Sequence, residues 1–356
     1  MTEFNGRLRV VSDVRRLPAE WEVQDGVMLT WPHGLGDWAP YLPGVEPVFV
    51  AIAREIAKRE KVVIVCGDET HRVHAELLLQ AAGVVMAKVQ FALSPSNDTW
   101  ARDHGPITVL QDGTPRLCDF TFDGWGEKYP ADLDNRITSN LQRLGMFGEL
   151  AVESVDLVLE GGGIESDGEG TLLATSRCLL NERRNTGITR EGMEKILGDR
   201  LGIGGFLWLE HGGLCGDDTD GHIDTLARFC DRGTIAYQAC SDVNDANHSE
   251  LKRMASELKA LRDTDGEPYR LVALPSPAPI RNAKGDQLPA SYANFLVING
   301  AVLVPTYDDP ADGPVLEKLA GCFPGREIVA IDCRPLLLQY GSLHCVTMQL
   351  PQGVLS

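Results

Sequence analysis

The 356-residue chain has no run of 18 apolar residues, which a helix needs to cross a bilayer. Residues 1–16 hold no long apolar stretch either, so we expect no signal peptide. Positive charge is scarce, because 33 lysines and arginines face 51 acidic residues for a net charge of −18. That balance argues against nucleic acid or an anionic membrane surface as a partner, and it is compatible with a small cationic substrate.

Several cofactor and metal signatures are also missing. The chain has no CxxC pair, no Walker A motif and no HExxH zinc helix. Its nine cysteines are scattered, and Cys66 and Cys230 each end an apolar run, as expected for buried thiols in a reducing compartment. We therefore predict a cytoplasmic protein. With 43% hydrophobic residues, the chain is long enough for one large domain or two smaller ones.

No low-complexity stretch or long polar linker divides the chain, and a strand–turn–strand pattern recurs along it. Apolar runs flank tight Gly-containing turns at Gly113, Gly168, Gly233 and Gly300, which predict four β-hairpins. The pair Asp25–Gly26 is a candidate fifth turn. Helix-like stretches lie between the hairpins, the clearest at 246–261, and two more are expected around 52–56 and 77–78. The period favours a repeat or propeller-like architecture, although it also describes a two-layer α/β sandwich.

Three short segments, 97–106, 218–224 and 341–345, each hold an acid, an imidazole or a thiol. A fold that joins them would combine the Cys345 thiol, the His222 imidazole and at least two carboxylates. A Cys–His pair alone suggests acyl transfer. Paired carboxylates beside it suggest an electrophile that is itself a cation, and the guanidinium is the biological cation with a carbonyl-like carbon.

Each of these residues also has an ordinary structural reading. Cys345 lies in an alternating, strand-like run and could be a buried structural thiol. His222 could belong to a surface turn. An EF-hand calcium loop is excluded, because its first and twelfth ligand positions would be Gly216 and Ala227. Asp224 follows His222 by two residues, so an extended backbone would point both side chains to one face.

With Leu17–Trp21, Thr30–Pro32 and the Leu159–Gly163 segment, these segments resemble the agmatine deiminase branch of the guanidine-modifying (pentein) superfamily, which also contains the peptidyl-arginine deiminases. The resemblance covers most of the chain and keeps the family's motif order. It implies an α/β fold, the pentein five-bladed α/β propeller with pseudo-fivefold ββαβ units around a central active site. It also implies a single catalytic domain, residues 1–356.

The resemblance implies a role for each candidate catalytic residue. Cys345 would be the nucleophile and His222 the general acid/base. Asp103 and Asp224 would bind the guanidinium, and Glu160 would support His222 through a hydrogen bond.

Three further residues are candidates for substrate binding. Trp100 could pack against the planar cation or be a buried aromatic. Asp98 could contact the substrate or cap a loop, and Asp218 matches an acidic position near the substrate's tail. Arg102 reads as a structural ion-pair partner.

The implied reaction is the hydrolysis of agmatine to N-carbamoylputrescine and ammonia through a thiouronium at Cys345, with no metal or organic cofactor. The approach to the cysteine, 339–345, departs from the family's longer Gly-Gly-Gly-Asn type, and this leaves the recognition of the substrate's far end open. Deimination of arginine or peptidyl-arginine is the alternative. A non-catalytic guanidine- or polyamine-binding protein and an unrelated Cys–His amidase are further candidates, and a homo-oligomer is compatible with the sequence.

Overall fold

The computed structural model describes residues 15–355. Its strands are β1 (Arg15–Arg16), β2 (Gln24–Thr30), β3 (Lys61–Cys66), β4 (Val89–Leu93), β5 (Ile107–Gln111), β6 (Thr114–Thr121), β7 (Val152–Val158), β8 (Glu165–Ser166), β9 (Thr171–Thr175), β10 (Gly205–Leu209), β11 (Ala227–Asp231), β12 (Thr234–Ala239), β13 (Arg270–Pro275), β14 (Leu296–Ile298), β15 (Ala301–Thr306), β16 (Glu327–Asp332) and β17 (Thr347–Pro351). The expectation that there is no signal peptide concerns residues 1–16, almost all of which lie outside the described range.

Helices connect the strands. The longer ones are α1 (Leu42–Ala57), α2 (Glu69–Ala81), α5 (Ile137–Arg143), α7 (Arg190–Leu201), α8 (His248–Ala260) and α9 (Asp312–Cys322). The single-turn ones are α3 (Ala101–His104), α4 (Gly124–Glu127), α6 (Ser176–Leu179) and α10 (Arg334–Leu337), and the 3-10 turns are η1 (Met86–Lys88), η2 (Asp134–Arg136), η3 (Gly161–Gly163) and η4 (Ile223–Thr225). The helices expected around 52–56 and 77–78 are confirmed as parts of α1 and α2, and the one expected at 246–261 is confirmed as α8 within that range.

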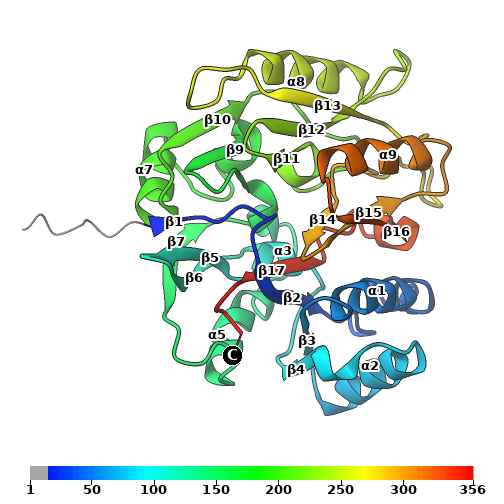
Figure 1. Ribbon diagram of the computed structural model, residues 1–356. Coiled ribbons are helices and arrows are strands. Elements are labelled where there is room, and N and C mark those ends of the chain that lie inside the picture. The colour runs from blue at the N-terminus through cyan, green and yellow to red at the C-terminus, as the bar shows by residue number, and fades with distance from the viewer. Residues whose placement is uncertain (1–14, 356) are drawn as a thin grey trace, which may run out of the picture.

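Five separate sheets are formed within the described residues, with the strand orders β1-β5-β6-β7, β8-β9-β10, β11-β12-β13, β14-β15-β16 and β17-β2-β3-β4. Each contains an antiparallel pair, β5-β6, β8-β9, β11-β12, β14-β15 or β17-β2, and β1 adds a second antiparallel pairing at β5. A helix then leads to a strand that pairs in parallel with the second strand of that pair. The ββαβ unit is thus repeated five times, and a two-layer sandwich of continuous sheets is excluded. In Figure 1 the longer helices lie at the periphery, whereas α3 and β17 lie near the centre.

The four predicted hairpins are present, and Asp25–Gly26 belongs to a fifth unit, although it is not a turn. Asp25–Gly26 lies inside β2, and β2 pairs antiparallel with β17 from the other end of the chain. The β-carbon of any larger residue at Gly26 would lie 2.4 Å from the carbonyl oxygen of Lys61, so the glycine allows the close approach of β2 to β3. The fifth unit is therefore assembled from both ends of the chain.

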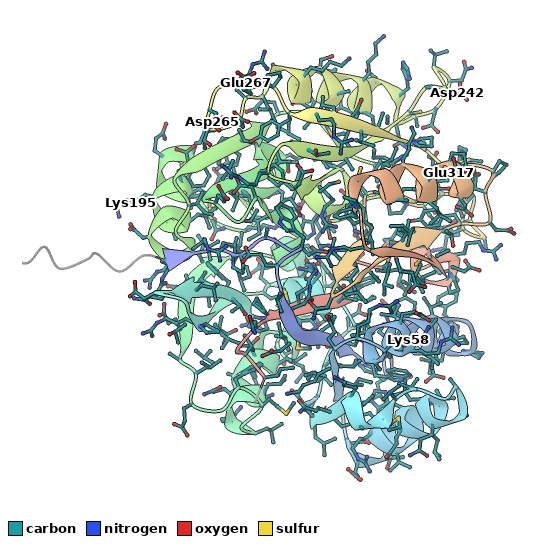
Figure 2. The ribbon with its side chains drawn as sticks, in the orientation of Figure 1. Lys58, Lys195, Asp242, Asp265, Glu267 and Glu317 are labelled. Carbon is teal, nitrogen blue, oxygen red and sulfur yellow. The ribbon has the colours of Figure 1, made fainter. Side chains whose placement is uncertain are left out.

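Burial follows the amphipathic pattern of these elements. In α8 the side chains of Leu251, Met254 and Leu258 are buried, because their spacing puts them on one helix face. Charged side chains such as Lys58 and Glu317 project from the surface (Figure 2). None of the helices within residues 15–355 combines the length and the hydropathy of a bilayer-crossing segment.

Candidate active site

The first strand of each antiparallel pair is preceded by a short turn, and these turns carry the candidate site residues. Asp103 lies in α3 before β5, and Glu160 precedes η3 and β8. His222 and Asp224 lie at η4 before β11, and Cys345 lies in the turn before β17. The contacts between α3, η3 and η4 and between α3 and β17 show that these turns meet in space. All five side chains are buried.

Two local predictions were wrong in detail. Cys345 is not in a strand, because β17 begins two residues later at Thr347. Asp224 does not follow His222 in extended backbone either, since the segment turns into the 3-10 helix η4. Long-range contacts with η3, rather than strand alternation, bring His222 and Asp224 together.

Gly162 shows how closely the side chains converge. A β-carbon built on Gly162 would lie 2.5 Å from Nδ1 of His222, 2.9 Å from Oδ1 of Asp103 and 3.2 Å from Oδ2 of Asp224. A β-carbon would fit at this position only if these functional groups moved away from their present places. The glycines of 161–163 therefore allow a backbone turn to pass directly under the three functional groups.

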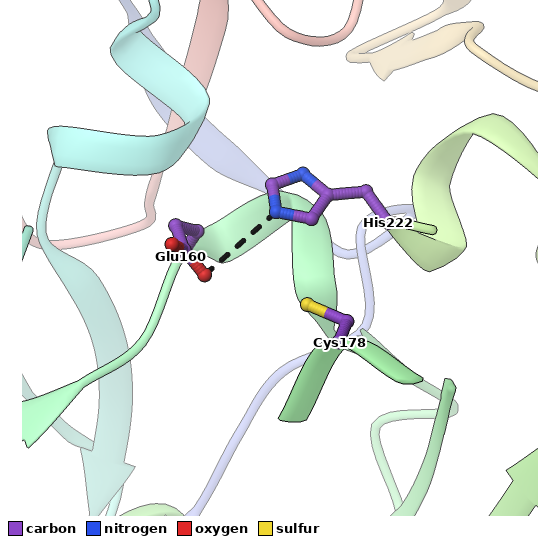
Figure 3. Close-up of side chains that lie close together, drawn as sticks. All are labelled: Glu160, Cys178 and His222. Atoms are coloured by element: carbon purple, nitrogen blue, oxygen red, sulfur yellow. Dashed lines mark ion pairs between the residues drawn. The ribbon is translucent and has the colours of Figure 1, made fainter. Parts of the chain in front are cut away.

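His222 lies between two carboxylates. Its Nδ1 is 3.7 Å from Oδ1 of Asp103, and its Nε2 is 3.7 Å from Oε2 of Glu160 (Figure 3). Both separations exceed ordinary hydrogen-bond length, so Glu160 contacts His222 as an ion pair rather than as the acceptor of a short hydrogen bond. Burial disfavours the imidazolium, but the charges of Asp103 and its other neighbours outweigh burial and raise the pKa of His222 well above its ordinary value.

Asp103 is held by two donors. Its Oδ1 accepts a hydrogen bond from the Gly162 amide at 3.1 Å, and its Oδ2 accepts one from the Trp125 indole at 3.0 Å. Burial raises the pKa of Asp103 to about 6, although His222 acts in the opposite direction. Trp125 was not predicted from the sequence.

Asp224 contacts both His344 and Cys345. Its Oδ2 is 2.8 Å from Nδ1 of His344 and 3.8 Å from Sγ of Cys345. Burial acts to raise the pKa of Asp224, but His344 and His222 together lower it. Asp224 is therefore the carboxylate of the pair that is held in its ionised form.

Cys345 is surrounded by groups that disfavour its charged form. Burial, Asp224 and Asp103 raise the pKa of Cys345 well above its ordinary value. The Ser342 backbone and the Asn294 side chain act in the opposite direction. A positive charge placed between the two carboxylates would reverse much of this effect.

Asn294 was missed in the sequence. It is buried just before β14, the position that the other site residues occupy before their strands. The only signal was its place ahead of the fourth predicted hairpin. Its side-chain oxygen accepts from the His344 amide at 2.9 Å, and its side-chain nitrogen lies 3.4 Å from Sγ of Cys345.

Arg184 was also missed. Its Nε donates to both carboxylate oxygens of Glu160, at 2.8 and 2.9 Å, and its two terminal nitrogens bond Asp220 and the Thr219 carbonyl. Burial acts to raise the pKa of Glu160, but His222 and the fully buried Arg184 together lower it. Arg184 thereby fixes Glu160 to the loop that carries His222.

A pocket opens above Cys345 and Asp103. Five aspartates and four aromatic residues contribute to its lining: Asp37, Asp98, Asp103, Asp217, Asp218, Trp100, Trp125, Tyr129 and Tyr340. None of the residues lining this pocket within the described range is a lysine or an arginine. Its acidity and aromatic walls match a cation with an apolar chain.

The three substrate-binding candidates, Trp100, Asp98 and Asp218, all line this pocket. Each of them also contacts another residue of the chain. Trp100 packs on Gly341, where a β-carbon would lie 2.0 Å from its ring. Asp98 accepts from the Trp38 indole at 2.8 Å, and Asp218 accepts from the Tyr129 hydroxyl at 2.9 Å. Burial raises the pKa of Asp218 to about 6.

Arg102, in contrast, makes no ion pair within the described residues. It donates to Gln349 and lines a different pocket, beside Glu20 and His344. The prediction of an ion-pair role was therefore wrong, because the flanking strand β17 offers an amide acceptor instead.

Known proteins resemble this chain over almost its whole length. Residues 16–351 match the model of the Porphyromonas-type peptidyl-arginine deiminase family. An agmatine deiminase of Pseudomonas syringae pv. tomato is 33% identical over 99% of both chains.

Two solved structures share the fold closely. A Porphyromonas gingivalis protein, described as a candidate arginine deiminase, has a TM-score of 0.89 and 48% identity over 96% of this chain and 100% of that one. A cysteine-to-serine variant of C. jejuni agmatine deiminase with substrate bound has a TM-score of 0.89 and 34% identity, covering 98% of this chain and 99% of that one.

Proposed function

Because this chain belongs to the Porphyromonas-type peptidyl-arginine deiminase family, we propose that it is a cysteine hydrolase that deiminates a guanidine, most specifically agmatine. The observation that carries the proposal is the convergence of His222, Asp103 and Asp224 on the turn at Gly162, with Sγ of Cys345 3.8 Å from Asp224 and an acidic pocket lined by Cys345 and Asp103. Relatives named agmatine deiminase match nearly the whole chain. The five ββαβ units would form a five-bladed propeller around this site, within one catalytic domain.

The guanidinium would bind between Asp103 and Asp224. It stays protonated at physiological pH, and its planar fork of N–H donors matches carboxylates from two sides. Its charge would offset the two carboxylates that raise the pKa of Cys345, so the thiolate would form once substrate is bound. Glu160, Trp100, Asp98 and Asp218 would serve as supporting and substrate-contacting residues.

In the first half-reaction, the Cys345 thiolate attacks the central guanidinium carbon and forms a C–S bond. The imidazolium of His222 gives a proton to the departing amino group, the C–N bond breaks, and ammonia leaves an S-alkylthiouronium on Cys345. The raised pKa of His222 suits it to begin as the acid.

In the second half-reaction, neutral His222 takes a proton from water, and the hydroxyl adds to the thiouronium carbon. The C–S bond then breaks, which releases a ureido product and restores the thiolate. The net change is one guanidinium and one water converted to one urea group and one ammonium. No metal or organic cofactor enters any step.

Agmatine is preferred over arginine because of the charge of the pocket. Agmatine ends in an ammonium, which the carboxylates of Asp217 and Asp218 would attract. The carboxylate of arginine would meet the same groups without a basic side chain to balance it. A cytoplasmic location and a homo-oligomeric state stay predictions, and polyamine synthesis is the pathway that agmatine would imply.

Deimination of arginine or peptidyl-arginine is the second candidate, and it is favoured by the 48% identity to the protein described as a candidate arginine deiminase. To decide, ureido product and ammonia should be measured from agmatine, arginine and an arginine-containing peptide, with Cys345→Ala beside wild type. We expect turnover of agmatine alone, abolished by the substitution. Faster turnover of arginine or peptide would overturn the substrate, and activity retained in Cys345→Ala would overturn the nucleophile.

A further inference from the structure

Beside the reaction centre lies a cluster of three side chains that can each bind a metal ion. The ligand atoms of Glu160, Cys178 and His222 all lie within 4.8 Å of one another, and the three groups point toward one another in Figure 3. They come from separate elements, because Cys178 lies in α6 while Glu160 and His222 precede η3 and η4. All three are fully buried.

His222 is the unusual member of this cluster. Neither of its ring nitrogens has a hydrogen-bond partner, although both are buried within the described part of the chain. A buried polar atom without a partner costs free energy, so native structures rarely keep one without a purpose. One of these nitrogens, Nε2, faces Glu160. The imidazole thus presents Nε2 to the cluster, while Nδ1 faces Asp103 at 3.7 Å.

We propose that Glu160, Cys178 and His222 form an inhibitory site for a zinc-type divalent cation. Thiolate, imidazole and carboxylate are the three ligand types that Zn²⁺ takes in proteins, and a water molecule would complete a tetrahedral set. This inference rests on the proposed function, because an ion on Nε2 would fix the remaining ring proton on Nδ1, the nitrogen that faces Asp103. His222 could then no longer alternate between imidazolium and neutral imidazole, as both half-reactions require. The ion would regulate the site by withholding its acid/base.

Arg184 is compatible with a cation at this position. Its Nε already donates to both oxygens of Glu160. A carboxylate nevertheless offers about four lone-pair sites, so one oxygen can still bind an ion. The surrounding charge also favours a cation, since Asp103 is within 3.7 Å of His222 and Asp224 shares the same turn at Gly162.

Burial determines how inhibition would develop. Neither Cys178 nor His222 lines the pocket above Cys345, so an ion must wait for local opening of the surrounding turns. We therefore expect slow-onset inhibition by micromolar zinc, reversed by a chelator. Agmatine should slow the onset, because its guanidinium, bound between Asp103 and Asp224, would repel a second cation beside His222.

The experiment measures binding separately from activity. Zn²⁺ stoichiometry and affinity should be determined for wild type, Cys345→Ala, Cys178→Ser and Cys178→Ala, with Cys240→Ala as a half-exposed cysteine control. Co²⁺ serves as the spectroscopic probe, since a thiolate ligand gives it a near-ultraviolet charge-transfer band. Thermal unfolding of each variant reports whether it folds, and the two Cys178 substitutions differ in size and polarity so that one misfolded variant does not end the test.

We expect one tightly bound ion with a cobalt–thiolate band in wild type, Cys345→Ala and Cys240→Ala. In the Cys178 variants, affinity should fall at least about 100-fold and zinc should no longer inhibit. Loss of binding in Cys345→Ala with binding kept in Cys178→Ser would overturn the proposal, because it would place the ion on the nucleophile. Absence of binding to wild type would overturn it as well. Binding through Cys178 in a wild type that turns over no guanidine would leave this site standing and would reject the proposed function instead.

Discussion

The side-chain nitrogen of Asn294 lies 3.4 Å from Sγ of Cys345, while the oxygen of the same amide accepts from the His344 and Cys345 backbone at 2.9 and 3.4 Å. One buried amide therefore holds both the turn that carries the thiol and the sulfur itself. Its nitrogen also lies 3.4 Å from the carbonyl oxygen of Asp224. Asn294 is the contribution of the fourth unit to a site that the other four units fill with acids, an imidazole and a thiol.

Asn294→Ala is expected to lower kcat by about 10- to 100-fold with a smaller change in KM, since a hydrogen bond to a charged group contributes about 1.5–3 kcal/mol. Loss of the donor should also raise the apparent pKa for thiolate formation in the enzyme–substrate complex. Steady-state kinetics from pH 6 to 10 measure both effects. Asn244→Ala, in an exposed loop, is the matched control. An equal loss of kcat at every pH would indicate a merely structural role.

Gly162→Ala is expected to reduce activity at least about 1000-fold, because the new β-carbon would lie 2.5 Å from His222 and 2.9 Å from Asp103. The chain should still fold, since the backbone conformation of Gly162 is not left-handed. Gly204→Ala is the control, as its β-carbon would meet nothing within 4 Å. Activity within tenfold of wild type in Gly162→Ala would show that the three side chains do not need their present separation.

The sequence predicted well those features that depend on neighbouring residues. The turns at Gly113, Gly168, Gly233 and Gly300 were recognisable, because a tight turn between apolar runs is a local signal. The pairing of β2 with β17 in the fifth unit was not recognisable, because these strands come from opposite ends of the chain and no local pattern encodes their pairing. Asp25–Gly26 looks like a turn only until the register of β2 is known.

The same distinction applies to the site. Cys345, His222, Asp103, Asp224 and Glu160 were recognisable because their segments resemble a known family. Asn294 and Arg184 lie outside those segments, and their importance comes only from contacts with residues far along the chain. Even Gly162, inside the Leu159–Gly163 segment, is important only because three side chains from other units approach it.

Arg184→Met is expected to destabilise the protein by about 3–5 kcal/mol at neutral pH, because it leaves the carboxylate of Glu160 buried without its partner. The pKa of Glu160 is lowered in the folded protein relative to the unfolded chain. The ionised Glu160 therefore stabilises the fold at neutral pH, and this stabilisation is lost as the pH falls through the lowered pKa of the folded state. The variant should therefore approach wild type as pH falls from 7 to 4.

Thermal or urea unfolding at several pH values tests this. Arg253→Met, which breaks only the exposed pair with Glu250, should cost less than about 1 kcal/mol at every pH. A deficit in Arg184→Met that is independent of pH would mean that lost packing, rather than the unpaired Glu160, is responsible.

Alkylation of Cys345 should respond to the charge of Asp224. In wild type, burial and the neighbouring carboxylates raise the pKa of the thiol, so inactivation by iodoacetamide should still be accelerating above pH 9, beyond the usual cysteine pKa of about 8.5.

Asp224→Asn removes a negative charge 3.8 Å from the sulfur, which should lower the apparent pKa of Cys345 by about one unit or more and speed alkylation at pH 8. Mass spectrometry of the labelled peptide confirms that Cys345 is the residue modified. Asp218→Asn, at the pocket wall, should leave the pH profile unchanged, and a profile unchanged in Asp224→Asn as well would show that burial alone sets the pKa of the thiol.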